Sequence, residues 1–445
     1  MKKLFGTDGV RGLANVELSP LLALKLGTTA AHVIIERKQN NRVLVGRDPR
    51  ISGDILESAM VAGICSQGVD AILAGVVPTP GVAYLTTSTS AAAGVVISAS
   101  HNPVKDNGIK FFGPDGYKLD DAVEASIEAH IEQFDEFPKP QGGDVGNIFR
   151  RHELVWEYAE HVKSTFSGSL AGMSLVIDCA NGAASELAPR VFEELGAQVT
   201  AINCNPNGVN INKDCGSLHP EQMASKGGEV GADVGLSFDG DADRAILADE
   251  RGELVDGDHV MALYALHRAR TGGLPTNSVV ATIMSNIGLE LALAKENISL
   301  VRTSVGDRYV SDEMRRSGAV VGGEKSGHII FSEHATTGDG MITVLQVLSI
   351  MNATGKRLSE LASEMEEYPQ LLVNVKVRTR DGWDQDKEIL SAIRDAEAKL
   401  EGRGRVVVRP SGTEKLIRVM AEGPDQQELE GLVGQICDAV KKSLG

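Results

Sequence analysis

Apolar runs rich in β-branched residues alternate with amphipathic runs of helical period through most of this 445-residue chain. The pattern starts three times, with a strand-like run followed by a loop, a helix and further apolar runs, at RVLVG (42–46), SLVIDC (174–179) and SVVATIM (278–284). Such alternation is typical of α/β domains on mixed or parallel sheets. We therefore expect three similar mixed α/β domains, with helices near Asp54–Cys65, Ser185–Leu195 and Leu289–Lys295.

The tail has a different pattern. Apolar runs at 371–378, 405–409 and 416–422 are separated by amphipathic runs that predict helices near Asp384–Leu400 and Gln426–Ser443. This order predicts a smaller C-terminal α+β domain. A length of 445 residues also fits several domains rather than one core. The expected domains are 1–152, 153–255, 256–368 and 369–445, divided near the amphipathic stretch Glu153–Thr165, the hairpin at 248–258 and the segment Glu366–Leu371.

Composition and charge limit the classes of molecule that this chain can bind. Hydrophobic residues make up 42% of the chain, and 44 Lys and Arg stand against 61 Asp and Glu, giving a formal net charge of −17. This charge repels nucleic acid and anionic membranes, so a bound phosphate needs a local cluster of cations and backbone N–H groups. The five cysteines show no metal-binding spacing, and no apolar leader or long apolar span is present. We expect a cytoplasmic protein with reduced, mostly buried thiols and no nucleic-acid or membrane partner.

The first loop with candidate chemistry is SASHNPVKDNGIKFF at 98–112, where small and β-branched residues lead into Ser100, His101 and Asn102. α/β folds place ligands at the carboxyl ends of strands, so this serine is a candidate nucleophile. The surroundings are not Gly-x-Ser-x-Gly, which argues against a hydrolase elbow. A serine-rich turn with a hydrogen-bonding histidine is the structural alternative.

The second loop, GLSFDGDADRAIL at 235–247, alternates three carboxylates with small residues. Asp239, Asp241 and Asp243 can converge on one hard cation, and Mg²⁺ keeps its remaining positions for water or phosphate. Glu250 stands twelfth from Asp239, as in a calcium EF-hand, but Arg244 occupies the sixth position, where that loop needs glycine. We therefore predict a magnesium site, with a solvated acidic turn as the alternative. Arg244 is placed to meet an anion on the metal.

The third loop is VVGGEKSGHII at 320–330. Glu324 and Ser326 can hydrogen-bond the paired hydroxyls of a sugar, and His328 belongs to the residue type that transfers protons near neutral pH. A glycine-rich turn with a surface histidine would explain the same residues.

The fourth loop, RVVVRPSGTEKLIRV at 405–419, gathers two guanidiniums, two hydroxyls and backbone N–H groups around a tight turn. This set forms a cradle for a phosphate dianion, although an ordinary basic turn is the alternative. The expected cradle residues are Arg409, Ser411, Gly412, Thr413 and Arg418. Neither a P-loop nor a dinucleotide fingerprint is present.

Each loop follows an expected strand, and each belongs to a different expected domain. A nucleophile, a hard-metal loop, a polyol-binding loop and a phosphate cradle can meet in one central cleft. Their combination predicts transfer of a phosphoryl group on a sugar phosphate.

These loops identify the chain as resembling the α-D-phosphohexomutase superfamily, from FGTDGVRG at 5–12 to RPSGTEKLIRV at 409–419. Within it, the chain most resembles members that act on glucosamine phosphates, because of NINKDCGSLHPE at 210–221, SVGDRYV at 304–310 and TTGDG at 336–340. The resemblance implies three similar mixed α/β domains and a smaller fourth domain around a deep cleft. It also implies an isomerase of amino sugar metabolism that feeds UDP-N-acetylglucosamine and cell-wall precursor synthesis.

The resemblance implies a mechanism as well. Ser100 would carry the active-site phosphate, and one phosphate oxygen would bind one Mg²⁺ per chain together with the three aspartates. Phosphate would pass to a 6- or 1-phosphosugar, giving a 1,6-bisphosphate that turns round before returning phosphate to Ser100. A hexosamine or hexose 1,6-bisphosphate would act as activator, and a homodimer is possible. Lys110 and His328 would be the acid/base candidates, Arg11 and Arg244 would neutralise charge, and Arg11, His101, Glu324, Ser326 and the cradle residues would bind substrate.

One position departs from the pattern of the glucosamine-specific members, and several alternative functions stay open. Lys325 stands where glucosamine-specific relatives more often have an uncharged amide, so it bears on sugar preference. A phosphomannomutase or phosphoglucomutase of the same mechanism would differ in its ratios of kcat/KM. A metal-dependent sugar phosphatase would release inorganic phosphate, and a non-enzymatic calcium or sugar-phosphate binding module would tolerate loss of Ser100.

Overall fold

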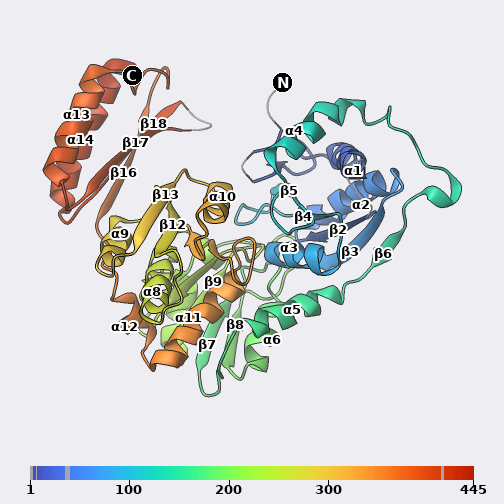
Figure 1. The fold of residues 1–445 in the computed structure, drawn as a ribbon, viewed down its shortest axis with the longest axis horizontal. Helices are drawn as coiled ribbons and strands as arrows, with labels where there is room; N and C mark the ends of the chain where they lie inside the picture. The colour runs from blue at the N-terminus through green and yellow to red at the C-terminus, as the bar shows by residue number, and fades with distance from the viewer. Residues whose placement is uncertain (1–3, 7, 36–40, 412–414) are drawn as a thin grey trace.

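Four sheets follow one another along the chain in the computed structural model (Figure 1). The structure describes residues 4–6, 8–35, 41–411 and 415–445. The first three sheets are flanked by helices, and the fourth, smaller sheet lies at the end of the chain with helices on one side. The expected fold class, three mixed α/β domains and a smaller C-terminal domain, is confirmed.

The first sheet has six strands in the order β1-β5-β4-β2-β3-β6, and β5 runs antiparallel to both of its neighbours. Alternate residues of β2 point to opposite faces: Val43 and Val45 pack in one buried cluster, and Leu44 packs in another. The elements are β1 (Val10–Leu13), α1 (Pro20–Ile35), β2 (Arg42–Arg47), α2 (Ile51–Cys65), β3 (Asp70–Val76), α3 (Thr79–Ser88), β4 (Ala93–Ile97), β5 (Asp106–Phe112), α4 (Asp121–His130) and β6 (Ile148–Arg150), with short 3-10 turns at Ile131–Gln133 and Gly142–Asp144.

The second and third sheets repeat the theme, each with parallel central strands and antiparallel strands at one edge. The second contains α5 (Leu154–Ser164), β7 (Ser174–Asp178), α6 (Leu187–Glu194), β8 (Gln198–Ile202), a 3-10 turn (Gly216–Leu218), α7 (Glu221–Val230), β9 (Val234–Phe238), β10 (Ala245–Ala248) and β11 (Leu254–Val255). The third contains α8 (Gly257–Arg270), β12 (Ser278–Thr282), α9 (Ile287–Ala294), β13 (Ser299–Thr303), α10 (Asp307–Ser317), β14 (Val321–Gly323), β15 (Ile329–Phe331), α11 (Gly340–Thr354) and α12 (Leu358–Ala362).

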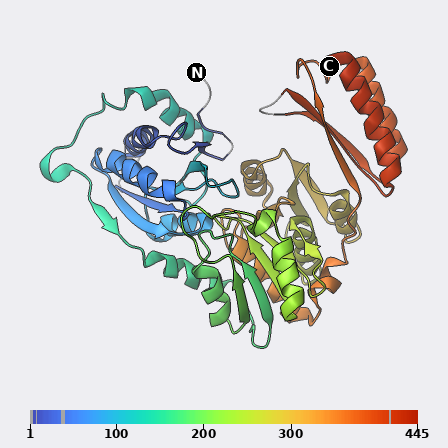
Figure 2. The same cartoon turned by 180° about the vertical axis from the view of Figure 1, so that it is seen from behind.

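The C-terminal domain has a three-stranded antiparallel sheet in the order β16-β18-β17. Its elements are β16 (Gln370–Lys376), α13 (Lys387–Leu400), β17 (Arg405–Pro410), β18 (Leu416–Glu422) and α14 (Gln426–Leu444). Both helices lie on the outer side of the sheet, and the other face turns toward the first domain in both views (Figures 1 and 2).

Buried apolar side chains show how the parts are joined. One cluster runs continuously from Leu44 to Met365 and so spans the first three sheets, whereas the C-terminal domain has a separate core from Val375 to Val440. The links from the third to the C-terminal domain include polar contacts, such as Arg405 to the Ser285 carbonyl at 2.5 Å and Ile287 N to Glu422 Oε2 at 3.1 Å. The last domain is therefore attached to the third at least partly by hydrogen bonds.

The expected helices are present with small shifts at their ends. The first begins at Ile51 rather than Asp54, with Arg50 at the N-cap position and no side-chain cap. The helix expected from Asp384 begins at Lys387, where the Asp386 side chain caps it. The domain limits 1–152, 153–255, 256–368 and 369–445 stay a prediction.

All five cysteines are free thiols, and only Cys204 is partly exposed. In the described ranges, no helix has the length and apolarity to cross a bilayer.

Candidate active site

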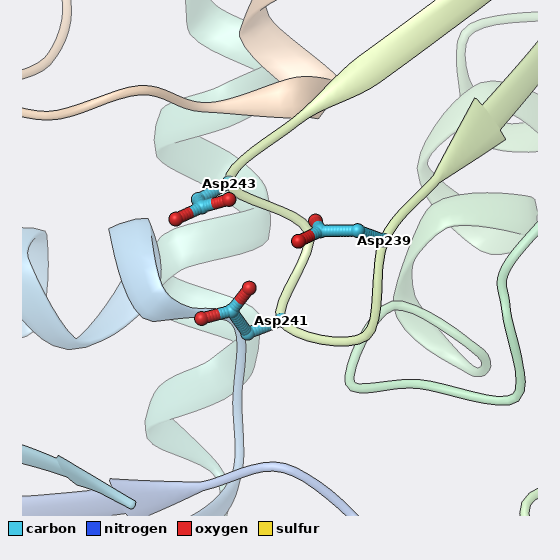
Figure 3. Close-up of side chains that lie close together, drawn as sticks. All are labelled: Asp239, Asp241 and Asp243. Carbon is cyan, nitrogen blue, oxygen red and sulfur yellow. The ribbon is translucent and has the colours of Figure 1, made fainter. Parts of the chain in front are cut away.

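The loop between β9 and β10 brings three buried carboxylates together. Asp239 and Asp241 are 1% exposed and Asp243 is 5% exposed, and one oxygen of each lies within 4.8 Å of the others. All three come from a single turn and face a common space (Figure 3). The left-handed conformation of Ala242, with φ 54°, makes this turn tight. The spacing of the three aspartates thus gives the expected convergence of hard oxygen ligands.

The electrostatics of this triad favour a bound cation. Burial, followed by repulsion from Asp243 and Asp241, raises the pKa of Asp239 well above its usual value. One oxygen each of Asp241 and Asp243 has no hydrogen-bond partner among the residues that the structure describes. Buried unpartnered carboxylate oxygens are costly without a cation, and an all-oxygen set suits Mg²⁺. These residues therefore fit a magnesium ion.

Ser100 lies three residues beyond β4 and meets this triad. Its hydroxyl donates to Asp239 Oδ2 at 2.5 Å and lies 3.2 Å from His101 Nδ1. Ser100 is 1% exposed and has φ 51°, a strained backbone region for a residue other than glycine. The predicted nucleophile and the predicted metal loop, 139 residues apart, are thus brought together.

Burial lowers the pKa of His101 to about 4, and the nearby guanidiniums of Arg244 and Arg11 add to this effect. The imidazole beside Ser100 is therefore neutral at neutral pH. A neutral ring can accept a proton from the serine hydroxyl.

A fully buried arginine holds the Ser100 loop in place, and the sequence analysis missed it. The Arg50 guanidinium donates to the carbonyls of Ser100 at 2.9 Å, Asn102 at 2.8 Å, Pro103 at 2.7 Å and Asp106 at 3.1 Å. Asp48 accepts from Arg50 Nε at 2.8 Å. Ser98 donates to Asp48 at 2.7 Å and accepts from the Ser100 N–H at 2.9 Å. Only a planar group with five donors can satisfy these acceptors at once, which makes Arg50 a positioning residue.

We expect Arg50→Lys to lower kcat by about 10²-fold, because a lysine ammonium cannot hold four carbonyls in one plane and the serine loses its position. Steady-state kinetics with a Mg²⁺ titration should show little change in metal activation. Arg47→Lys is the control, since Arg47 is the last residue of β2, close to Arg50 in the chain, and its partner Asp54 is exposed. A kcat for Arg50→Lys close to that of the control would contradict the positioning role.

Lys110 reaches the triad from β5. Its Nζ lies 3.2 Å from Asp241 Oδ2, 3.4 Å from Asp8 Oδ1 and 3.8 Å from Asp243 Oδ2, and it is 2% exposed. Burial lowers the pKa of this amine, but the three carboxylates outweigh it and raise the pKa above its usual value. Lys110 is thus held in its charged form, which can donate hydrogen bonds and offset negative charge. Asp8 was not predicted as a site residue.

Thr79 supports the metal loop from the start of α3. Its hydroxyl donates to Asp241 Oδ2 at 2.6 Å and its backbone N–H donates to the Asp241 carbonyl at 3.0 Å. The first domain thus fixes the position of a residue in the second.

His328 approaches the triad from the third sheet. It is 2% exposed, and its Nε2 lies 4.0 Å from Asp243 and 3.8 Å from Asp307. Both ring nitrogens are buried, and neither has a hydrogen-bond partner in the described parts of the chain. Lys118 joins Asp307 at 2.5 Å to Asp8 at 2.8 Å, which ties the third domain to the first. Lys118 and Asp307 were also missed.

The predicted arginines border the same space. Arg244 Nε lies 3.7 Å from Asp243, and its backbone N–H donates to Asp239 at 3.3 Å. Arg11 pairs with Asp8 and lies 3.3 Å from the Ala99 carbonyl, at the base of the Ser100 loop. Both guanidiniums can therefore offset an anion at Ser100.

The loop that we predicted to bind the sugar lies between β14 and β15. Glu324 is half-buried and accepts from the Gly306 N–H at 3.2 Å, while Ser326 is exposed and lies 3.5 Å from Glu324. Lys325 pairs with Glu367 at 2.6 Å and lies 3.6 Å from Asp256. Its charge is compensated, so Lys325 presents no free cation to an amino sugar.

The predicted phosphate cradle lies on β17 and β18, in the C-terminal domain. Arg409 and Arg418 stand directly opposite each other in the sheet, and Ser411 is 2% exposed. Burial and repulsion from Arg418 lower the pKa of Arg409, as expected for two neighbouring cations. Gly412 and Thr413 lie outside the described residues. In the described part of the chain, no hydrogen bond or ion pair joins either arginine to the Ser100 or aspartate loops, so the structure does not bring the cradle into contact with them.

Four family models match the chain in order. They are described as Phosphoglucomutase/phosphomannomutase alpha/beta/alpha domains I, II and III and C-terminal domain, and they match residues 2–137, 156–252, 256–368 and 372–439. The match covers most of the chain and contains all four loops.

Individual proteins of the same family are also similar to this chain in sequence or in structure. A phosphoglucosamine mutase from Desulforamulus reducens is 52% identical over 441 residues, which covers 99% of each chain. A phosphoglucomutase/phosphomannomutase family protein from Burkholderia thailandensis has a similar structure, with a TM-score of 0.82, 23% identity and coverage of 99% of this chain and 98% of that one. Aspergillus fumigatus N-acetylphosphoglucosamine mutase, solved with GlcNAc-6P and magnesium, has a TM-score of 0.68 at 18% identity and covers 99% of this chain and 95% of that one.

Proposed function

Because this chain belongs to the phosphoglucosamine mutases of the phosphoglucomutase/phosphomannomutase family, we propose that it interconverts glucosamine 6-phosphate and glucosamine 1-phosphate through a phosphoserine at Ser100 and a 1,6-bisphosphate intermediate. The family's members are intramolecular phosphotransferases of the isomerase class. The observation that carries the proposal is the 2.5 Å hydrogen bond between the Ser100 hydroxyl and Asp239, inside a buried triad of carboxylates.

The residues around Ser100 have complementary roles. Arg50 and Asn212 hold the Ser100 carbonyl, which aims its side chain at the aspartates. Lys110, Arg11 and Arg244 offset the charge of the transferring phosphoryl group, which is where such reactions gain most from fixed cations. His328, with both ring nitrogens unpartnered among the described residues, is our candidate for moving the proton of the sugar hydroxyl.

Asp239, Asp241, Asp243 and an oxygen on Ser100 would hold Mg²⁺, which supplies positive charge that polarises the phosphoryl group. The A. fumigatus mutase was solved with magnesium, and the same requirement is part of this proposal.

The bisphosphate must present each of its phosphates to Ser100 in turn. Arg409, Ser411, Gly412, Thr413 and Arg418 would hold the phosphate that is not reacting, and Glu324 and Ser326 would bind hydroxyls that look alike in the two orientations. A bisphosphate activator, a homodimer and a cytoplasmic location belong to the proposal and are supported only by the resemblance.

We expect Arg418→Ala to raise KM for glucosamine 6-phosphate by roughly 10- to 100-fold, since a charge-assisted hydrogen bond to phosphate contributes about 1.5–3 kcal/mol. Steady-state kinetics at several Mg²⁺ concentrations should show an unchanged metal requirement. Arg403→Ala, which removes a surface arginine of the same domain, is the control. Equal KM values for the two variants would remove Arg418 from the cradle.

The proposed function is tested by turnover. Phosphorylated protein with Mg²⁺ and a trace of hexose 1,6-bisphosphate is given glucosamine, glucose or mannose 6-phosphate, and products are read by phosphorus NMR. We expect a 1-phosphate, formed fastest from the amino sugar. A preference for a neutral sugar would indicate a phosphoglucomutase or phosphomannomutase instead. Inorganic phosphate as the only product would indicate a phosphatase.

A further inference from the structure

Two cysteines meet at the carboxyl ends of neighbouring strands in the second sheet. Cys179 follows β7 and Cys204 follows β8, and these strands run parallel with Asp178 opposite Ile202. Neighbouring strands lie about 4.8 Å apart, and disulfide-bonded cysteines have Cα atoms about 4.4–6.8 Å apart. The Cys204 thiol donates to the Ile202 carbonyl at 3.0 Å, and the Cys179 N–H donates to the same carbonyl at 3.2 Å. Their placement is therefore compatible with a bond between the two sulfurs.

The two thiols differ in access to solvent. Cys179 is fully buried, whereas Cys204 is partly exposed and lines a cavity of about 460 Å³ that also borders Trp156 and Pro206. The neighbouring Cys179 thiol lowers the pKa of Cys204, while the neighbouring Cys204 thiol and burial raise the pKa of Cys179. A small oxidant would thus meet the more acidic thiol first, with the buried thiol directly behind it.

The turn after Cys179 rests on the metal loop. The Ala183 N–H donates to the Gly240 carbonyl at 2.8 Å, and a Cβ added to Gly182 would lie 2.4 Å from that oxygen. The Asn181 side chain accepts from the Asn205 N–H at 3.1 Å, next to Cys204. A displacement of either cysteine would therefore be passed to the loop that carries Asp239 and Asp241.

We propose that Cys179 and Cys204 are a peroxide-sensitive thiol pair whose disulfide switches the enzyme off by displacing the metal loop. Hydrogen peroxide oxidises Cys204 to a sulfenic acid and releases one water. The Cys179 sulfur then attacks the Cys204 sulfur, the sulfenic hydroxyl leaves with the Cys179 proton as a second water, and the disulfide forms. Two thiols are oxidised and one peroxide is reduced. A dithiol reductant reverses the change.

The test treats the full-length protein with hydrogen peroxide and counts free thiols under denaturing conditions. We expect the count to fall from five to three, with peptide mass mapping joining Cys179 to Cys204, and mutase activity to be mostly lost and then restored by dithiothreitol. The thiol count does not depend on turnover, so it stands even if the proposed function fails.

Cys204→Ser should keep its activity in peroxide and form no such disulfide. Its hydroxyl can still donate to the Ile202 carbonyl, as the thiol does at 3.0 Å. The matched control is Cys65→Ser, whose thiol also donates to a backbone carbonyl but lies in the first domain, and this variant should lose activity like the wild type. Five remaining thiols, a disulfide through Cys215, or equal inactivation of Cys204→Ser and wild type would each overturn the proposal.

Discussion

Replacing Ser100 with alanine should lower the mutase rate by at least about 10⁴-fold, because the acceptor oxygen of the phosphoryl group is removed. Ser100 contributes little to the apolar cores, so the variant should unfold at a temperature close to that of the wild type. Turnover of glucosamine 6-phosphate and intact-protein mass, before and after incubation with a 1,6-bisphosphate, are the measurements. The wild type should gain one phosphate, and the variant none.

The matched control is Ser58→Ala, because the Ser58 hydroxyl on α2 donates only to the Asp54 carbonyl at 2.8 Å. That variant should keep both the rate and the phosphate. A rate for Ser100→Ala within a few-fold of wild type, or phosphate on another residue of the variant, would end the phosphoserine mechanism.

The second large effect concerns two neighbouring aspartates. Asp241→Asn and Asp239→Asn should both remove most of the activity, but they should change the metal-free protein in opposite directions. Asp241 faces the buried Lys110 at 3.2 Å, so its loss leaves a buried cation short of a partner and destabilises the protein by about 3 kcal/mol. Asp239 is repelled by Asp243 and Asp241, so its replacement should stabilise the metal-free protein. Denaturant unfolding in EDTA and in Mg²⁺ measures both effects.

The pH dependence of stability follows from the same groups. The pKa of Asp239 is raised in the folded state, so the folded protein binds a proton more tightly than the unfolded chain does. The metal-free wild type should therefore lose stability as pH rises from 3.8, the usual pKa of an aspartate, through the raised pKa of Asp239. Asp239→Asn should flatten this slope, and Mg²⁺ should offset the loss in the wild type.

Asp241 behaves in the opposite sense. Burial raises its pKa, but Lys110 and the Thr79 hydroxyl outweigh burial and lower it below 3.8. Its contribution to stability is present above pH 3.8 and disappears as pH falls through the lowered value. An unchanged Mg²⁺ response in Asp239→Asn and Asp241→Asn would remove the metal assignment.

Local patterns in the sequence predicted the sheets and the loops that carry the chemistry. The alternation of apolar runs indicates strands, and polar residues directly after them indicate the carboxyl ends where α/β folds bind ligands. The aspartate spacing was sufficient to predict the triad, because its three members share one turn. Ser100 could be predicted because it is a polar residue just beyond an apolar strand.

The supporting residues were missed because their roles depend on partners far away in the chain. Arg50 looks like an ordinary arginine before a helix, and only the fold places it under four carbonyls of residues 100–106. Lys118 and Asp307 are 189 residues apart, and neither lies in a pattern that periodicity can detect. Strand β5 was not predicted, since its apolar residues follow a polar loop without alternation.

The separate core of the C-terminal domain has a kinetic consequence. Among the described residues, this domain shares no buried apolar cluster with the other three, so a tilt on its polar contacts would leave its own core buried. In the mechanism that we propose, a bisphosphate that has left Ser100 either turns round while the cradle holds one phosphate or diffuses away, and each of these events has its own rate. The ratio of these rates fixes how many turnovers one activated enzyme completes before it must be primed again. Substitutions at the Arg405–Ser285 contact should therefore change the number of turnovers per activation before they change the chemistry.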